Sequence, residues 1–172
     1  MRKQVLTFLV VLLAGIFMLG LIGCGESTKT IKEGDLTVKY STEAKKSVEL
    51  PADYPKDRFP VYKNAFIMSV QNMQNSYVVA CFCKESIKEV GAFYKDFFKK
   101  SQVISSTEMD DEYTILGVKD GYTYTVCVIK NTDQDDAIKG YPTSLAISLV
   151  PAPDGMSKSL EGMSGNLPAP PK

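Results

Sequence analysis

Hydrophobic residues first form one unbroken run near the N-terminus. Arg2 and Lys3 precede this run, which extends from Val5 to Ile22 without a charged side chain. A positive start, an apolar stretch and small residues at its end are the layout of a secretory signal peptide. A membrane-spanning helix is the competing interpretation, since about 18 apolar residues just cross roughly 30 Å of hydrocarbon. Residues 24–26 carry no Lys or Arg, which favours the signal peptide, because positive charge usually follows a stop-transfer helix.

Beyond residue 60 the hydrophobic pattern predicts short strands and one helix. Strands are expected where β-branched and aromatic residues cluster, at residues 65–70, 76–84, 102–108, 112–119, 122–130 and 143–150. The run at 76–84 is apolar on both faces, which is typical of a central strand. The helix follows Ser86 and Glu89, which have the spacing of a capping box, and should end near Lys100. Its apolar face is formed by Val90, Phe93, Tyr94, Phe97 and Phe98.

The dipeptide Asp120-Gly121 predicts a two-residue type I′ hairpin between two of these strands. In the resulting register residue 118 opposes 123, 117 opposes 124 and 114 opposes 127, so Tyr124 can lie over Gly117. One face, assigned to the helix side, holds Tyr113, Ile115, Tyr124, Val126 and Val128. The opposite, wetter face holds Thr114, Thr123, Thr125 and Cys127.

These elements predict a single α+β domain at residues 59–151. It has an antiparallel sheet of five to six strands and one packed amphipathic helix, in the order β-β-α-β-β-β-β. Residues 24–58 are interpreted as the N-terminus of the exported protein and a flexible tether, although residues 36–40 alternate as a strand would. A coil of about 26 residues would reach roughly 28 Å. Residues 152–172 are rich in Pro, Gly and Ser and are expected to be a disordered tail.

Composition excludes several classes of function. Residues 1–23 hold two of the 20 Lys and Arg residues and no acid, so the remaining 149 residues carry 18 against 20 Asp and Glu, a net charge near −2. Nucleic acid is therefore not an expected partner, because phosphates require a positive face. The chain has no histidine, which excludes Ser-His-Asp and Cys-His catalysis and His-ligated zinc. The 15 Phe and Tyr residues beyond residue 23 suffice for one sizeable core.

Three cysteines fall on predicted strands. Cys81 and Cys83 are two residues apart and share a face, and Cys127 lies on a later strand. Buried free thiols are one interpretation, since cysteine often packs as a small hydrophobe. A disulfide between Cys127 and either Cys81 or Cys83 stays open in an exported protein, as does a soft-metal or redox trio.

Two other groups of residues have the composition of ligand sites. Asn131, Asp133 and Asp135 have the 1, 3, 5 spacing of a calcium loop, but Asp136 replaces the required Gly and Pro142 the bidentate Glu. We interpret this stretch as a polar connection. A stacking surface for a glycan or peptide is the alternative to a structural role for the strand tyrosines Tyr77, Tyr113, Tyr122 and Tyr124.

The tetrad Leu21-Ile22-Gly23-Cys24 resembles the lipobox of bacterial lipoproteins. By this resemblance the Cys24 thiol receives a diacylglyceryl group, signal peptidase II cleaves between Gly23 and Cys24, and Cys24 becomes the first residue. Two acyl chains give a durable anchor. The resemblance implies a cell-membrane protein on the extracytoplasmic side, at the extracellular face or in the periplasm.

A second resemblance concerns the domain. The pattern P-x-Y-x-x-A at 60–65, followed by a strand and a helix containing Phe93-Tyr94, resembles small exported α+β domains, many of them lipoproteins of unassigned function. This resemblance concerns the fold and not the activity. The tether, the single small core and the lack of catalytic residues predict a non-enzymatic domain that binds an envelope protein or cell-wall partner and has no cofactor and no metal. The alternatives are a ligand or glycan sensor on the sheet face and a thiol-based redox or metal-binding protein.

Overall fold

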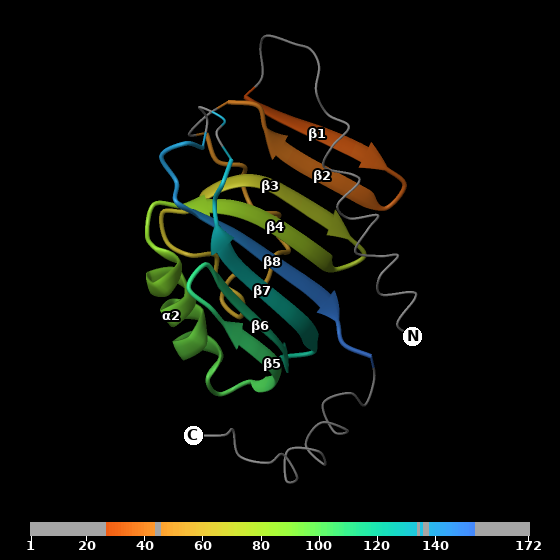
Figure 1. Cartoon of the computed structure of the whole chain (residues 1–172). Coiled ribbons are helices and arrows are strands. Elements are labelled where there is room, and N and C mark those ends of the chain that lie inside the picture. Colours follow the sequence, from red (N-terminus) through yellow and green to blue (C-terminus); the bar gives the residue numbers. More distant parts are fainter. Residues whose placement is uncertain (1–26, 44–45, 134, 136–137, 154–172) are drawn as a thin grey trace, which may run out of the picture.

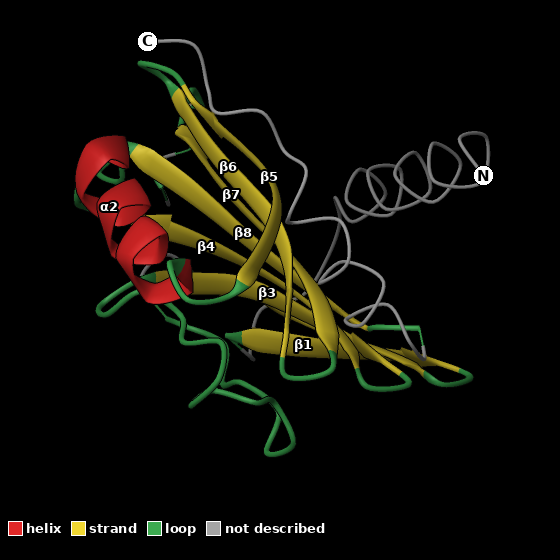
Figure 2. Ribbon diagram, turned by 90° about the horizontal axis from the view of Figure 1, so that it is seen from below, coloured by secondary structure: helices red, strands yellow, loops and turns green. Residues whose placement is uncertain are grey.

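The computed structural model describes residues 27–43, 46–133, 135 and 138–153. They form an eight-stranded antiparallel sheet with a helix, α2 (Ile87–Phe98), across one face (Figures 1 and 2). The strand order is β1-β2-β3-β4-β8-β7-β6-β5, so the last strand inserts between two meanders. The strands are β1 (Thr28–Glu33), β2 (Leu36–Ser41), β3 (Phe66–Met73), β4 (Ser76–Cys83), β5 (Gln102–Glu108), β6 (Glu112–Lys119), β7 (Tyr122–Lys130) and β8 (Thr143–Pro151).

The predicted capping box begins α2. The Glu89 N–H donates to Ser86 Oγ at 3.3 Å, and the Ser86 N–H donates to Glu89 Oε2 at 2.9 Å. The Ser86 hydroxyl also donates to Glu89 Oε2 at 2.7 Å, and this bond, followed by the one from the Ser86 N–H, holds the pKa of Glu89 below its usual value. The helix ends at Phe98, before the expected Lys100, because the Ser101 hydroxyl and backbone N–H both donate to the Phe98 carbonyl. The prediction of this element is confirmed.

The predicted hairpin and both of its faces are confirmed. Asp120 and Gly121 have φ of 48° and 81°, the left-handed values that a type I′ turn requires. Thr114 pairs with Cys127 and Gly117 with Tyr124, as the turn predicts. The face with Tyr113, Ile115, Tyr124, Val126 and Val128 is buried under α2, and Tyr124 covers Gly117.

Two strands lie where the sequence predicts a flexible tether. β1 and β2 form a hairpin around Gly34, and β2 pairs with β3, with Val38 opposite Gln71. The tether at 24–58 is therefore wrong for the described part of that range, and five to six strands is too few. The hairpin lies at the sheet edge, where most side chains are exposed or half-buried, so polar Lys and Thr residues are tolerated and its composition resembles that of a coil.

The domain also begins earlier than residue 59. Val48 and Tyr54 join Phe59 and Tyr62 in the core on the helix side of the sheet. The Tyr54 hydroxyl donates to the Phe59 carbonyl at 2.9 Å, which closes the Pro-rich loop on itself. The Tyr94 hydroxyl of α2 donates to the Pro60 carbonyl at 3.1 Å. Residues 46–65 therefore complete the layer that α2 begins.

The lipidation and cleavage predictions at Gly23 and Cys24, like the signal peptide at 1–23, lie outside the described residues. So does the predicted tail from residue 154 onward. Among the residues that the structure does describe, no helix is both long and apolar enough to cross a membrane.

Candidate functional site

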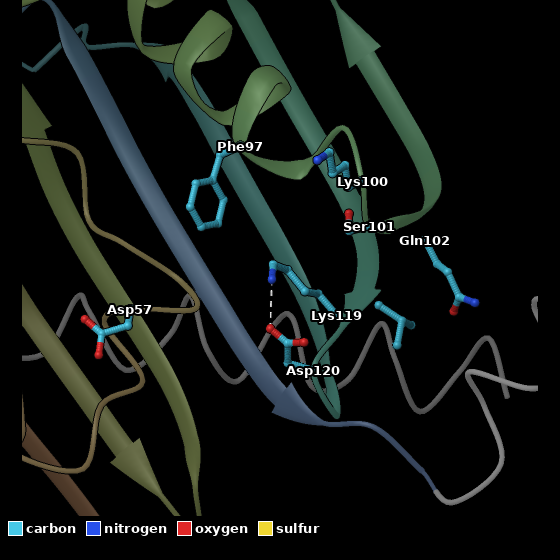
Figure 3. A pocket seen from close by; sticks show the side chains of 8 residues that line it. Asp57, Phe97, Lys100, Ser101, Gln102, Lys119 and Asp120 are labelled. Atoms are coloured by element: carbon cyan, nitrogen blue, oxygen red, sulfur yellow. Dashed lines mark hydrogen bonds and ion pairs between the residues drawn. The ribbon is translucent and has the colours of Figure 1, made fainter.

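A cleft of about 570 Å³ lies where α2 ends against the β6–β7 hairpin (Figure 3). Phe97 and Lys100 come from the helix end, Lys119 and Asp120 from the hairpin, and Asp57 from the loop before β3. Charges of both signs around an aromatic ring suit a polar or zwitterionic ligand. No local sequence pattern marks this cleft, because its walls come from three distant segments.

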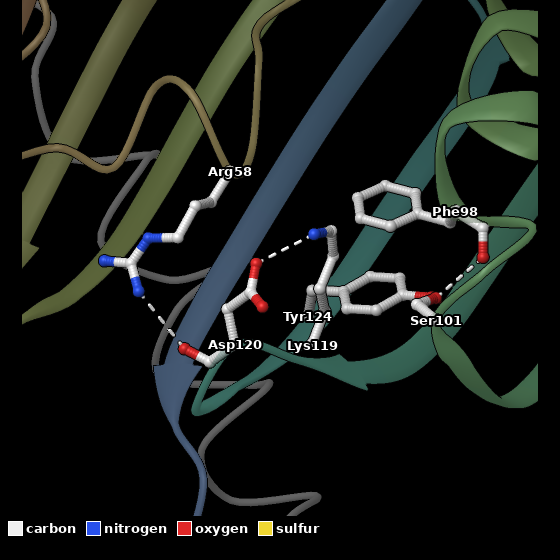
Figure 4. Close-up of polar contacts among 6 residues, drawn as sticks. All are labelled: Arg58, Phe98, Ser101, Lys119, Asp120 and Tyr124. Carbon is white, nitrogen blue, oxygen red and sulfur yellow. Dashed lines mark hydrogen bonds and ion pairs between the residues drawn. The ribbon is translucent and has the colours of Figure 1, made fainter.

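Electrostatic contacts fix the rim of the cleft (Figure 4). Lys119 Nζ lies 2.8 Å from Asp120 Oδ2 and 5.8 Å from the centre of the Phe97 ring. Arg58 Nη1 donates to the Asp120 carbonyl at 3.3 Å, and its guanidinium lies 5.5 Å from the centre of the Tyr122 ring. The hairpin turn is thereby joined to the loop that contributes Asp57.

Ser101, which lines the cleft, is hydrogen-bonded to the packed core beside it. Phe98 stacks on Tyr124, with ring centroids 4.0 Å apart and planes 12° from parallel. Ser101 Oγ donates to the Phe98 carbonyl at 2.8 Å and lies 2.5 Å from the Tyr124 hydroxyl. The Ser101 hydroxyl therefore contacts a carbonyl and a phenol.

The three described cysteines are free thiols on opposite faces of the sheet. Cys81 and Cys83 are buried on the helix side. Cys81 is in register with Leu145 and, through it, with Val128, whereas Cys127 pairs with Ala146. Because neighbouring residues on a strand point to opposite faces, Cys127 points away from both other thiols. The disulfide that the sequence leaves open between Cys127 and Cys81 or Cys83 is therefore not formed, and the three thiols do not gather at one site.

Burial also makes the two inward thiols poor nucleophiles. Desolvation, and then the charge of Glu85, raise the pKa of Cys83 to about 12. Desolvation, with a smaller effect of Cys83, raises the pKa of Cys81 as well. The thiolate is the reactive form, and burial disfavours it at both residues.

We expect these thiols to make the domain less stable in alkali. Their pKa values are raised in the native state, so both states are protonated below pH about 9, whereas above it only the unfolded chain loses protons. Stability should fall as pH rises from about 9 to 10, by roughly 1.4 kcal/mol per pH unit for each such thiol. Urea unfolding at several pH values measures this slope. In Cys81→Ala, the part of the fall in the free energy of unfolding that the two thiols cause should be about half as large. An unchanged free energy of unfolding of the unmodified domain between pH 8 and 10 would contradict the prediction.

The predicted polar connection uses its side chains to hold its own backbone. Asn131 Nδ2 donates to the carbonyls of Ile138 at 3.3 Å and Tyr141 at 2.8 Å. Asn131 Oδ1 accepts from the Asp133 N–H, and Asp133 Oδ1 from the Asp135 N–H, both at 3.0 Å. Within the described part of the chain, no three acidic, Cys or His side chains gather as a metal site would require.

The strand tyrosines do not form a stacking surface. Tyr77, Tyr113 and Tyr124 are at most 4% exposed and belong to the core under α2 and the preceding loop. Tyr122 is half-buried and packs edge-on against Phe59. Three of the four tyrosines are therefore buried too deeply to stack on a glycan.

No protein-family model, curated protein or solved structure matches this chain.

Proposed function

We propose that the protein is a bacterial lipoprotein, held at the extracytoplasmic side of the cell membrane by a diacylglyceryl group on Cys24. The observation that carries the proposal is the sequence Leu21-Ile22-Gly23-Cys24 at the end of an uninterrupted apolar run with Arg2 and Lys3 before it. The position of β1 supports it, because a folded domain that begins at Thr28 follows directly on the proposed new N-terminus.

We further propose that the domain acts by binding an envelope protein or a cell-wall component. Support comes from the chemistry of the described side chains. The chain has no histidine, and its two inward thiols are buried with raised pKa values. The cleft between Asp57, Phe97, Lys100, Lys119 and Asp120 offers charges of both signs without an activated nucleophile, so it is the candidate contact site.

Replacing Cys24 with alanine should abolish fatty-acid incorporation. The change removes the only atom to which the diacylglyceryl group would be attached. Metabolic labelling of the protein with a fatty acid measures this loss. Cys127→Ala is the matched control, because it removes a half-buried thiol outside the proposed anchor and should leave labelling unchanged. Equal labelling of the Cys24 variant and the unmodified protein would remove the basis of the proposal.

A further inference from the structure

The β1–β2 hairpin has two chemically different faces. Its helix-side positions are hydroxyl and lysine residues: Thr28, Thr30, Lys32, Thr37, Lys39 and Ser41. Its other face carries Ile31 paired with Val38, Leu36 paired with Glu33, and Tyr40 paired with Lys29. The register continues from Val38 through Gln71 to Val78, the neighbour of the core residue Val79, which places this apolar set on the sheet face away from α2.

Neither cluster of buried residues in the described chain includes any residue of this hairpin. Ile31 is 39% exposed, and Met73, which lies on the same face of β3, is 38% exposed. We call Ile31, Leu36, Val38, Tyr40 and Met73 the hairpin face. Its alternation with polar residues is the pattern of a sheet that contacts something apolar on one side.

The short stretch of chain between Cys24 and β1 would place a lipid on Cys24 close to the hairpin face. The Thr42 N–H donates to the Ser27 carbonyl at 2.9 Å, so Ser27 already belongs to the folded domain. Only two residues separate it from Cys24, and a fully extended chain covers at most about 11 Å over this step. A headgroup layer is itself roughly 5–8 Å thick. A lipid on Cys24 would therefore hold the start of β1 at the headgroup surface.

We propose that the hairpin face lies against the bilayer that holds the anchor, a placement that rests on the proposed lipidation of Cys24. Ile31, Val38 and Tyr40 would sit at the boundary between headgroups and acyl chains, where aromatic and aliphatic side chains of peripheral segments bind. The Lys29 ammonium, paired across the strands with Tyr40 at the end nearest Cys24, would lie among lipid phosphates. The helix α2 packs on β6 and β7, toward the other end of the strand order and on the opposite face, and stays free to meet a partner (Figure 2).

The absence of tryptophan from the chain allows a direct test, because one introduced tryptophan is the sole reporter of its kind. Ile31→Trp places the reporter on the hairpin face. Lys32→Trp is the matched control, since it is one residue further along the same strand but on the other face. Each full-length, lipidated variant is reconstituted into vesicles of anionic and zwitterionic phospholipids with brominated acyl chains. Bromine quenching of tryptophan fluorescence should be at least about twofold stronger at residue 31 than at residue 32.

Vesicle flotation and thermal unfolding of the same samples separate the outcomes. If both variants float and are folded, equal quenching at the two positions, or quenching at neither, would overturn the bilayer contact while leaving the anchor intact. A tryptophan at residue 31 that is protected from aqueous acrylamide but not quenched by bromine would show that a protein surface covers the hairpin face, which also overturns it. Failure of the unmodified protein to float would instead refute the anchor itself, and the bilayer contact with it.

Discussion

Replacing Phe98 with alanine should lower the free energy of unfolding by about 3–5 kcal/mol, the range for removing a buried aromatic side chain. Phe98 is 1% exposed and occupies the junction of helix, sheet and loop. Its ring stacks on Tyr124 at 4.0 Å between centroids and lies 6.2 Å from both Tyr94 and Phe59. Tyr124 lies on β7, Tyr94 lies one turn earlier in α2, and Phe59 lies in the loop before β3. Because these neighbours belong to separate segments, they cannot move together to fill the cavity that alanine would leave.

Phe97→Ala is the matched control, because the same side chain is removed from the preceding position of α2. Phe97 is only half-buried and lines the cleft, so its loss leaves a dent in the surface rather than an internal cavity. Urea unfolding followed by circular dichroism gives both free energies. Losses of equal size in the two variants would contradict the described packing of Phe98.

Replacing Gly117 with alanine should also destabilise the domain, by about 1–3 kcal/mol, because it overpacks a closed site. A Cβ at this position would lie 2.5 Å from the Gln102 carbonyl oxygen and 2.7 Å from Tyr124 Cζ, and would overlap the Tyr124 hydroxyl. Pairing of β5 with β6 prevents Gln102 from moving away. The phenol is equally confined, because Ser101 and Phe98 hold it in place.

Gly140→Ala provides the control for the general effect of removing a glycine. Nothing lies within 4 Å of a Cβ at that position, so its stability should change little. Thermal unfolding of the two variants beside the unmodified domain measures the difference. If Gly117→Ala unfolds at the temperature of Gly140→Ala, the close approach of Tyr124 to β6 is not as described.

The elements that the sequence predicts well are those specified by local chemistry. Ser86 and Glu89 start α2 within one turn, and Asp120-Gly121 determines both the turn and the register of its strands. Strand alternation also predicted correctly that Tyr124 would face the helix and Cys127 would not.

The features that the sequence did not predict depend on contacts between distant segments. The β1–β2 hairpin gains order by pairing with β3, which its polar composition does not indicate. The insertion of β8 between β4 and β7 separates Cys81 from Cys127, and no local signal marks it. The cleft needs Arg58 beside Asp120, 62 residues apart in the chain.

The hairpin also changes the expected position of the domain relative to the membrane. A coil from residue 25 to 50 would place the domain about 28 Å from the proposed anchor. With Ser27 already bonded to Thr42, the reach from Cys24 shrinks to about 11 Å. With the proposed lipid on Cys24, a partner of this domain would therefore lie close to the membrane surface.

We propose above all that the chain is cleaved before Cys24 and lipidated on it. The most direct test is the intact mass of the full-length protein, expressed in a bacterial host and extracted from membranes with detergent, with fragmentation of its N-terminal peptide. We expect a chain that has lost residues 1–23 and begins with a diacylglyceryl-modified Cys24. A mature protein that retains residues 1–23, or that begins with an unmodified Cys24, would contradict it.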